Sequence, residues 1–193
     1  MPEIESHPFP ALLPPKATVM MMGTFPPKAE KHAMQFHYPN FINDMWRIFG
    51  LVFFADKTHF VDEPNKTFKL DELRTFLTEK GVGLYDTATA VNRTTGTAAD
   101  KDLEVVEPTD LDALLLQVPA CKSVVVTGQL AADVLRVHFN IAEQPKVGSY
   151  VTFRFQPDGR EMRLYRMPSS SRAYPLKVEK KAELYKAMFE EAL

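Results

Sequence analysis

The sequence predicts an α/β protein in which helices are layered against a mostly parallel sheet. Short apolar runs typical of strands alternate along the chain with segments of helical periodicity, and this alternation is typical of layered α/β folds. The chain has 193 residues, a length that suits a single domain with a sizeable core. We therefore expect one domain over residues 1–193, with residues 1–16 as an extended N-terminal arm.

The arm is expected to be extended because it carries prolines at positions 8, 10, 14 and 15. The apolar run that follows, 17–23, is bounded by turn signals and predicts a buried strand. Residues 24–27 read Thr-Phe-Pro-Pro, which cannot lie inside a helix.

Two helices and a strand are predicted next. Apolar residues recur at intervals of three and four over 42–53, which indicates an amphipathic helix that begins near Asn40 or Asn43. Leucines and a phenylalanine over 70–77 mark a second helix, which Gly81 closes. A strand is expected over 82–88.

The second half of the chain continues the alternation. Its predicted elements are a helix over 110–118, a β-branched strand over 123–127, a helix after Gly128, a hairpin of 150–155 and 162–167 around Pro157-Asp158-Gly159, and a C-terminal helix over 177–193.

Composition excludes several classes of protein. One cysteine rules out an internal disulfide framework, a four-cysteine zinc site and a four-cysteine iron–sulfur cluster. No apolar stretch approaches the roughly 20 residues of a membrane span, and residues 1–6 are acidic without a basic-then-apolar leader. We therefore expect a cytoplasmic protein. The net charge of −2 argues against polyanion binding by the whole surface.

Four loops follow predicted strands and are rich in small, hydroxyl-bearing or turn residues. They are 23–27, 86–89, 127–129 and 167–172. Because ligands of parallel sheets bind beyond the carboxyl ends of the strands, these loops are expected to form a pocket of backbone donors, hydroxyls and one aromatic face. None of them contains a conventional nucleophile–base pair.

These loops and their neighbours carry a resemblance. The segments are 20–26 (MMMGTFP), 38–39 (YP), 43–48 (NDMWRI), 83–86 (GLYD), 92–100 (NRTTGTAAD), 126–128 (VTG) and 167–171 (MPSSS). In order and spacing over about residues 17–176, the set resembles the uracil-DNA glycosylase superfamily, and most of all its hypoxanthine-DNA glycosylase branch. The resemblance implies a three-layer α/β/α sandwich that cleaves the N-glycosidic bond of a deaminated base in DNA.

The resemblance also implies roles for residues at the pocket. The first loop, with Gly23, Thr24, Phe25 and Pro26, matches the motif that binds water and base, although Thr24-Phe25 stands where the superfamily often has Asn or Asp. In the hypoxanthine branch that role passes to an Asn three residues before Trp-Arg, and Asn43 is the matching catalytic position. Further base-binding residues implied by the match are Asp86, Thr127 and Gly128.

The second motif is the loop that relatives insert into the minor groove. Its matching residues are Pro168, Ser169, Ser170 and Ser171, whose backbone donors and hydroxyls can hold phosphates. Arg172 or Tyr174 could fill the gap that a flipped base leaves. Met167, where some relatives have His or Asn, fits the hypoxanthine branch better than uracil-type O2 stabilisation.

The implied chemistry suits these residue types. The glycosidic bond breaks through an oxocarbenium-like state, so donors aimed at the departing base matter more than a strong nucleophile. Base flipping costs a few kcal/mol, and stacking on Phe25 could return about 1–3 kcal/mol. We expect a monomer that acts on DNA containing a damaged base, without metal or cofactor. Two alternatives remain: a non-catalytic nucleic-acid or nucleotide-binding protein, and a hydrolase of free nucleosides.

Simpler interpretations stand beside these roles. Asn43 could simply be a helix cap without a catalytic role, Phe25 could be a core residue, and Asp86 could stabilise a turn. The serines could form an ordinary polar turn and residues 92–96 a surface loop. We expect His32 and His37 not to be metal ligands, because no carboxylate–histidine spacing supports a site.

Basic residues also cluster near two of the loops. They are Lys28 and Lys31 after the first loop, and Arg172, Lys177, Lys180 and Lys181 after the second motif. This arrangement predicts a basic rim around the pocket, although solvated helix faces would give the same runs.

Overall fold

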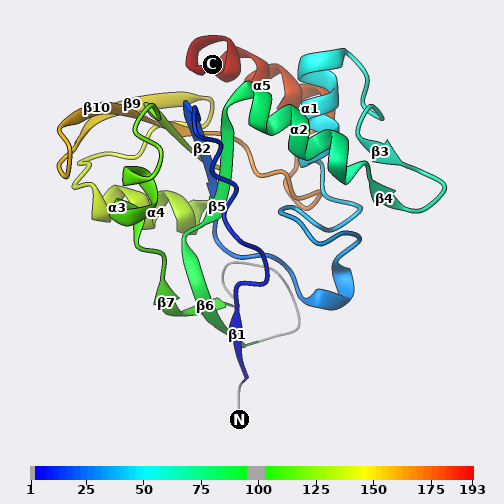
Figure 1. Cartoon of the computed structure of the whole chain (residues 1–193), viewed down its shortest axis with the longest axis horizontal. Coiled ribbons are helices and arrows are strands. Elements are labelled where there is room, and N and C mark those ends of the chain that lie inside the picture. The colour runs from blue at the N-terminus through cyan, green and yellow to red at the C-terminus, as the bar shows by residue number, and fades with distance from the viewer. Residues whose placement is uncertain (1–2, 95–102) are drawn as a thin grey trace.

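The computed structural model describes residues 3–94 and 103–193, and a five-stranded sheet forms its centre (Figure 1). In spatial order the strands are β5 (Val82–Asp86), β2 (Val19–Gly23), β8 (Ser123–Val126), β10 (Arg160–Arg166) and β9 (Ser149–Phe155). The first four are parallel, and β9 joins β10 as an antiparallel edge hairpin. The predicted α/β class with a mostly parallel sheet is confirmed.

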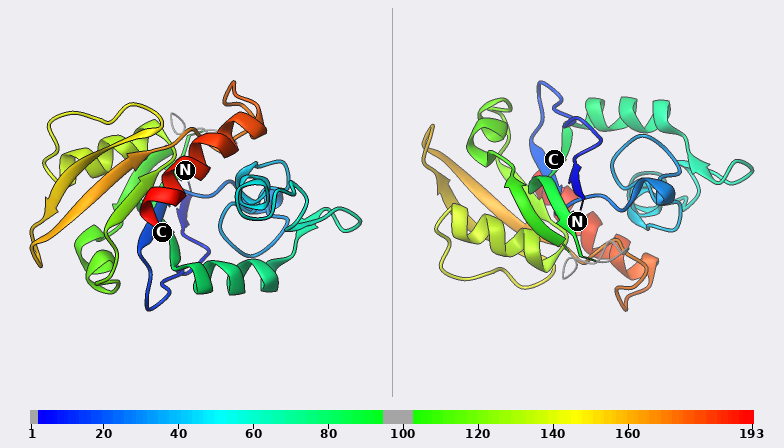
Figure 2. Two further views of the ribbon diagram at one scale, coloured as in Figure 1. Left: turned by 90° about the horizontal axis from the view of Figure 1, so that it is seen from above. Right: turned by 90° about the horizontal axis from the view of Figure 1, so that it is seen from below.

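Helices cover both faces of this sheet (Figure 2). The helices are α1 (Met45–Phe54), α2 (Leu70–Lys80), α3 (Leu111–Leu116), α4 (Gln129–His138), α5 (Val178–Ala192) and the short 3-10 helix η1 (Ala29–Lys31). Side chains of α1, α2 and α5 pack in one core, and those of α3 and α4 pack in the other. None of the helices in the described ranges is long and apolar enough to cross a membrane.

The alternation of side chains along β2 builds these two cores. Met21 joins the core of α1, α2 and α5, whereas Met20 and Met22 join the core of α3 and α4. Successive strand residues point to opposite faces of a sheet, so an unbroken apolar run is what a strand covered on both sides requires.

A second, three-stranded antiparallel sheet departs from our expectations. It consists of β1 (Ile4–Ser6), β6 (Ala88–Arg93) and β7 (Leu103–Pro108). The strand expected over 82–88 ends at Asp86, because the chain bends at Thr87 and a separate strand, β6, begins at Ala88. The chain then continues as β6 toward the N-terminus (Figure 1).

The prediction of a surface loop over 92–96 is therefore wrong for residues 92 and 93, which belong to β6. Residues 95–100 of the matching segment lie outside the described residues. A small hairpin of β3 (Val61–Asp62) and β4 (Thr67–Phe68) was also not predicted.

Helix boundaries follow local chemistry. Gly81 ends α2 in the left-handed conformation at φ 75°, as predicted. The start expected for α1 near Asn40 or Asn43 comes slightly later, at Met45, because residues 40–43 form turns before the helix.

Candidate functional site

A cavity of about 600 Å³ lies at the carboxyl ends of the parallel strands, within the usual range of about 300–1,000 Å³ for ligand sites. The right-hand view of Figure 2, seen from below, faces this end of the sheet. The predicted residues that line it are Gly23, Thr24, Phe25, Pro26, Asn43, Asp86, Thr127, Gly128, Ser169, Ser170, Ser171 and Arg172. The four loops therefore meet, as the shared edge of parallel strands requires.

Three side-chain oxygens converge at Gly23. A Cβ at this position would lie 3.0 Å from Asp86 Oδ1, 3.7 Å from the Tyr38 hydroxyl and 3.9 Å from Thr127 Oγ1. Because Gly23 carries no side chain, the space between these oxygens stays open. The shape of the cavity therefore depends on a glycine at this position, because any side chain would fill this space.

Asp86 presents one carboxylate oxygen to this space. Its Oδ2 accepts a hydrogen bond from His7 Nε2 at 2.7 Å, and its side chain is only 12% exposed. Its position at the end of β5 is fixed by pairing with Gly23 and by Thr109, whose hydroxyl donates to the Asp86 carbonyl (2.6 Å). Within the described ranges, no protein group donates to Oδ1, which is left to accept from a ligand.

His7, His37 and Asp86 offer potential metal-ligand atoms within 4.8 Å of one another. The hydrogen bonds, however, suit a proton better than a metal. His7 Nδ1 accepts from the N–H of Phe9 (3.1 Å), which places the ring hydrogen on Nε2, facing Asp86. If Nε2 bound a metal, that hydrogen would have to move to Nδ1, where the Phe9 N–H already points.

His37 is held by different partners. Its Nε2 donates to the carbonyl of Pro10 (2.9 Å). Burial lowers the pKa of the imidazole, with the Asp86 carboxylate opposing this shift in part. His37 therefore contributes a neutral ring to the cavity wall. The expectation that His32 and His37 are not ligands stays a prediction.

Asn43 lines the cavity and also stabilises the start of α1. Its Oδ1 accepts from the N–H of Met45 (2.9 Å), and its carbonyl accepts from Arg47 Nη1 (3.0 Å). The capping role and the pocket position therefore coexist. With Oδ1 engaged, the amide Nδ2 is the group left to donate into the cavity.

A buried ionic cluster holds the serine loop, residues 169–172, against α1. Lys181 is fully buried and donates to Asp44 Oδ2 (3.1 Å) and to the Ser171 carbonyl (2.8 Å). Arg172 Nε lies 3.3 Å from Asp44 Oδ1, and the Asp44 N–H donates to the Ser170 carbonyl (2.9 Å). The predicted basic rim is wrong for Lys181, whose charge is used inside the protein.

The serine hydroxyls remain available as donors. Ser169 Oγ accepts from the N–H of Ser171 (3.1 Å), and Ser171 Oγ accepts from the N–H of Ala173 (3.2 Å). Each hydroxyl accepts within the loop, so its proton can donate outward. This geometry suits an anionic group such as a phosphate.

Two predicted DNA-binding residues do not line the cavity. Pro168 is buried, and its carbonyl accepts from the Tyr185 hydroxyl (2.7 Å). The Tyr174 ring instead lies 5.8 Å from Lys181 Nζ. Met167 packs in the core of α1, α2 and α5 rather than facing the cavity. Of the two candidates for a wedge, the structure thus brings only Arg172 to the cavity.

Phe25 is a half-buried ring in the cavity wall, tied to the N-terminal arm. Its ring centroid lies 5.3 Å from that of His7, at an interplanar angle of 75°. Arg93 fixes the same loop by donating to the Pro26 carbonyl (3.1 Å) and pairing with Glu5 (2.8 Å). The first loop is therefore braced by β1 and β6.

Tyr38 lines the cavity, although the sequence predicted no role for it beyond its place in the matching segment 38–39. Its backbone takes a left-handed φ of 51°, which is uncommon outside glycine. Its buried hydroxyl has no well-formed hydrogen bond among the described residues, although Thr127 lies nearby. Burial and the neighbouring Asp86 raise the pKa of this phenol. The Tyr38 hydroxyl is therefore available to form a hydrogen bond with a water molecule or a ligand in the cavity.

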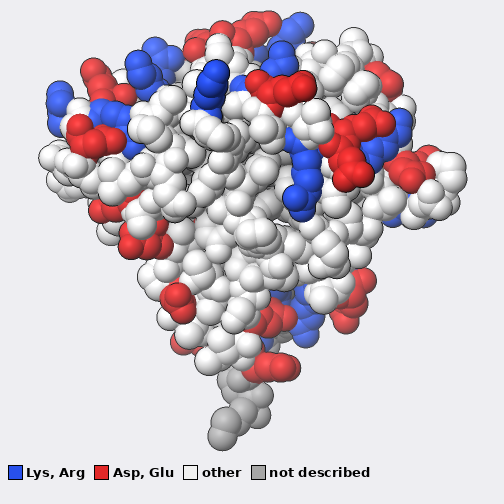
Figure 3. Space-filling view, in the orientation of Figure 1, with Lys and Arg blue, Asp and Glu red and all other residues white. Residues whose placement is uncertain are grey.

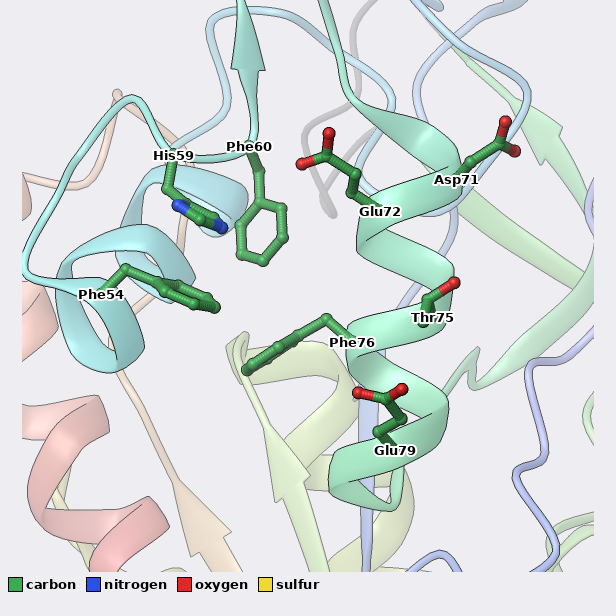
Figure 4. Close-up of a pocket in the computed structure, with 8 residues that line it drawn as sticks. All are labelled: Phe54, His59, Phe60, Asp71, Glu72, Thr75, Phe76 and Glu79. Atoms are coloured by element: carbon green, nitrogen blue, oxygen red, sulfur yellow. The ribbon is translucent and has the colours of Figure 1, made fainter.

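A second cavity, of about 380 Å³, lies between α1 and α2 (Figure 4). Its aromatic side is formed by Phe54, His59, Phe60 and Phe76, with the Phe54 and His59 rings stacked at 3.6 Å. The carboxylates of Asp71, Glu72 and Glu79 border it. These negative charges would repel a phosphate backbone, so this cavity is a poor candidate for a nucleic-acid site.

Charged side chains are mixed over the surface. On the face shown in Figure 3, basic and acidic side chains are interspersed in the upper half, around a broad uncharged area. This face offers no continuous basic area, in keeping with the net charge of −2.

The chain has an α/β fold with a candidate ligand cavity at the carboxyl edge of its sheet. No family model matches the chain, and no curated protein matches it. Its fold is similar to the solution NMR structure of a "putative Uracil DNA glycosylase" from Methanosarcina acetivorans. The identity is 20%, the TM-score is 0.64, and the match covers 98% of this chain and 99% of that one. At this identity the similarity shows the fold alone.

Proposed function

We propose that the chain is a monofunctional DNA glycosylase of the uracil-DNA glycosylase superfamily, with a three-layer α/β/α sandwich. Its substrate is DNA that contains hypoxanthine or a related deaminated base, uracil or xanthine, in base excision repair. The observation that carries the proposal is the cavity in which Asn43, Asp86 and Thr127 meet at the carboxyl edge of the sheet. The similarity of the fold to that of the archaeal protein supports it.

Asp86 is proposed to read the base. Deamination changes adenine N1 and cytosine N3 from hydrogen-bond acceptors into N–H donors. An ionised carboxylate only accepts, so Asp86 Oδ1 can bind hypoxanthine or uracil through this N–H. Adenine and cytosine would instead place a nitrogen lone pair against the carboxylate, which would then have no hydrogen-bond donor. Leaving a buried polar group without a partner is costly, and this cost lets polar sites discriminate strongly between substrates.

Asn43 is proposed to hold the attacking water. In the reaction, the bond between C1′ and the base nitrogen breaks, and its electron pair leaves with the base. The water oxygen bonds to C1′ and releases a proton, which passes to the departing base, directly or through solvent. The N-terminus of α4, at Gly128, borders the same cavity without a side-chain cap. Its N–H groups favour the negative charge of the departing base.

DNA contacts are proposed for the loops around the cavity. Phe25 offers a surface on which the flipped base can stack, and the hydroxyls of Ser169 and Ser171 face outward for phosphates. Arg172 is the candidate for entering the gap in the duplex. We propose that the protein works as a monomer in the cytoplasm and needs no metal or cofactor for this step.

Incubation with duplex and single-stranded oligonucleotides that contain inosine, uracil or xanthosine tests the function. Alkali cleaves the abasic product, and a gel resolves it. We expect cleavage at the deaminated base, reduced at least tenfold by Asn43→Ala and unchanged in Asn65→Ala, an exposed asparagine in the β3–β4 turn. No product from any substrate at enzyme excess would refute catalysis, and binding without turnover would favour the non-catalytic alternative.

A further inference from the structure

The N-terminal arm reaches into the candidate site through one side chain. His7 lies 79 residues from Asp86 in sequence, yet its Nε2 is 2.7 Å from Asp86 Oδ2. The His7 side chain is only 3% exposed, and its ring also contacts the Phe25 ring of the first loop. His7 therefore touches the proposed base-reading carboxylate from behind.

Several independent contacts fix this part of the arm. β1 pairs with β6, and the His7 N–H donates to the Thr89 carbonyl (2.8 Å). Phe9 is buried, and Leu12 exchanges two backbone hydrogen bonds of 3.0 Å with Leu84. The arm is thus held on both sides of His7, and the imidazole cannot move away from Asp86 without breaking these bonds.

The imidazole is also fixed in its hydrogen-bonding role. Because Nδ1 accepts from the Phe9 N–H (3.1 Å), the ring hydrogen lies on Nε2 and points at Asp86. A donor on Oδ2 leaves Oδ1 as the oxygen that faces the cavity beside Gly23. Without this donor, the carboxylate would be free to rotate about its bond to Cβ, and a buried charge would lose its partner.

We propose that His7 is a positioning residue that aims Asp86 at the flipped base, so that the N-terminal arm is a required part of the base-reading site. This inference rests on the proposed function. It assigns the arm a role in selecting deaminated bases, beyond its packing against β6. His7 does not touch the substrate and acts only through the carboxylate.

Single-turnover kinetics on inosine-containing DNA test the proposal. We expect His7→Ala to lower the rate about 10- to 100-fold, the effect of losing a hydrogen bond to a charged group. We expect His7→Gln, whose amide can reach Oδ2 as a donor, to recover most of the rate. His59→Ala serves as the matched control, because this half-buried histidine stacks on Phe54 and does not line the candidate site.

A double-mutant cycle separates positioning from general stability. In an Asp86→Asn background, His7→Ala should cost less than about twofold, because no carboxylate remains to be positioned. The proposal is overturned if His7→Ala costs the same factor in both backgrounds, or if His7→Gln is as slow as His7→Ala. Thermal melts of all variants identify any that fail to fold.

Nitrogen-15 NMR of the histidine rings tests the same contact without any catalysis. We expect His7 to show a protonated Nε2 and an unprotonated Nδ1, and Asp86→Asn to shift the Nε2 signal. If the chain cleaves no deaminated base but this spectrum appears, the proposed function fails and the contact stands. If it cleaves DNA while His7 carries its hydrogen on Nδ1, the positioning role fails and the glycosylase stands.

Discussion

The empty space at Gly23 predicts a variant that loses activity while it keeps its fold. In Gly23→Ala, the new methyl group would lie 3.0 Å from Asp86 Oδ1, whereas ordinary contacts of this kind begin near 3.4 Å. The carboxylate must therefore retreat by about 0.4 Å. Because His7 holds the other oxygen, Oδ2, at 2.7 Å, this movement would rotate the carboxylate and turn Oδ1 away from the position in which it would bind the base.

The expected loss follows from this displacement. A misplacement of about 1 Å at a reacting centre can cost about 100-fold in rate. A shift of a few tenths of an ångström, together with a methyl group in the binding space, should cost about 10- to 100-fold in kcat/KM. This corresponds to about 1.4–2.7 kcal/mol. The backbone at Gly23 is not left-handed, so alanine adds no backbone strain and the melting temperature should change little.

The assay compares two glycine variants. Gly83→Ala would press a methyl group against the Met20 sulfur and the Leu12 carbonyl, so it should lower the melting temperature through the core. Gly23→Ala should instead lower the glycosylase rate at nearly native stability. Full activity in Gly23→Ala would refute the geometry assigned to Asp86, because a substrate atom could not then occupy the space beside Gly23.

Three further predictions concern the protein around the site. Lys181→Met leaves the buried Asp44 carboxylate with the exposed Arg172 as its remaining cationic partner among the described residues, and should cost up to about 3–5 kcal/mol of unfolding free energy in urea; a loss below about 1 kcal/mol would contradict the buried pair. Burial lowers the pKa of His37 below 6.5, so its imidazole binds a proton more readily in the unfolded chain than in the folded one. Unfolding free energy should therefore fall as pH drops below 6.5, less steeply in His37→Gln; equal slopes would contradict this. Burial raises the pKa of the Cys121 thiol to about 11, so a thiol reagent at pH 8 should label it only after unfolding; rapid native labelling would contradict its burial.

The main sheet was predictable because its strands are covered on both faces. The run 124–126 consists of three consecutive valines without a polar position, and such a run is typical of a strand that is buried on both sides. β1 and β6 gave no such signal, since β1 reads Ile-Glu-Ser with its glutamate paired to Arg93. Short antiparallel strands of this kind are set by their partners rather than by their own composition.

The candidate site was predictable to the extent that it depends on strand ends. Gly23, Asp86 and Thr127 each end or directly follow a parallel strand, so topology alone brings them to one edge. His7 and Tyr38 were not predictable in this way, because they come from the arm and from an irregular loop. Their positions depend on tertiary contacts such as the β1–β6 pairing, which no local pattern of the sequence encodes.

The balance of charge indicates where selectivity must come from. Lys181 is used inside the protein, Lys180 pairs with Glu183, and Arg172 shares Asp44. Much of the positive charge that follows the serine loop is therefore already compensated within the protein. If the chain acts on DNA as we propose, phosphate contacts should supply only a modest, salt-sensitive part of the affinity. Deamination of adenine or cytosine puts one hydrogen on a ring nitrogen of the pairing edge. A fixed acceptor in a confined cavity can sense that hydrogen, whereas a basic surface binds every duplex alike.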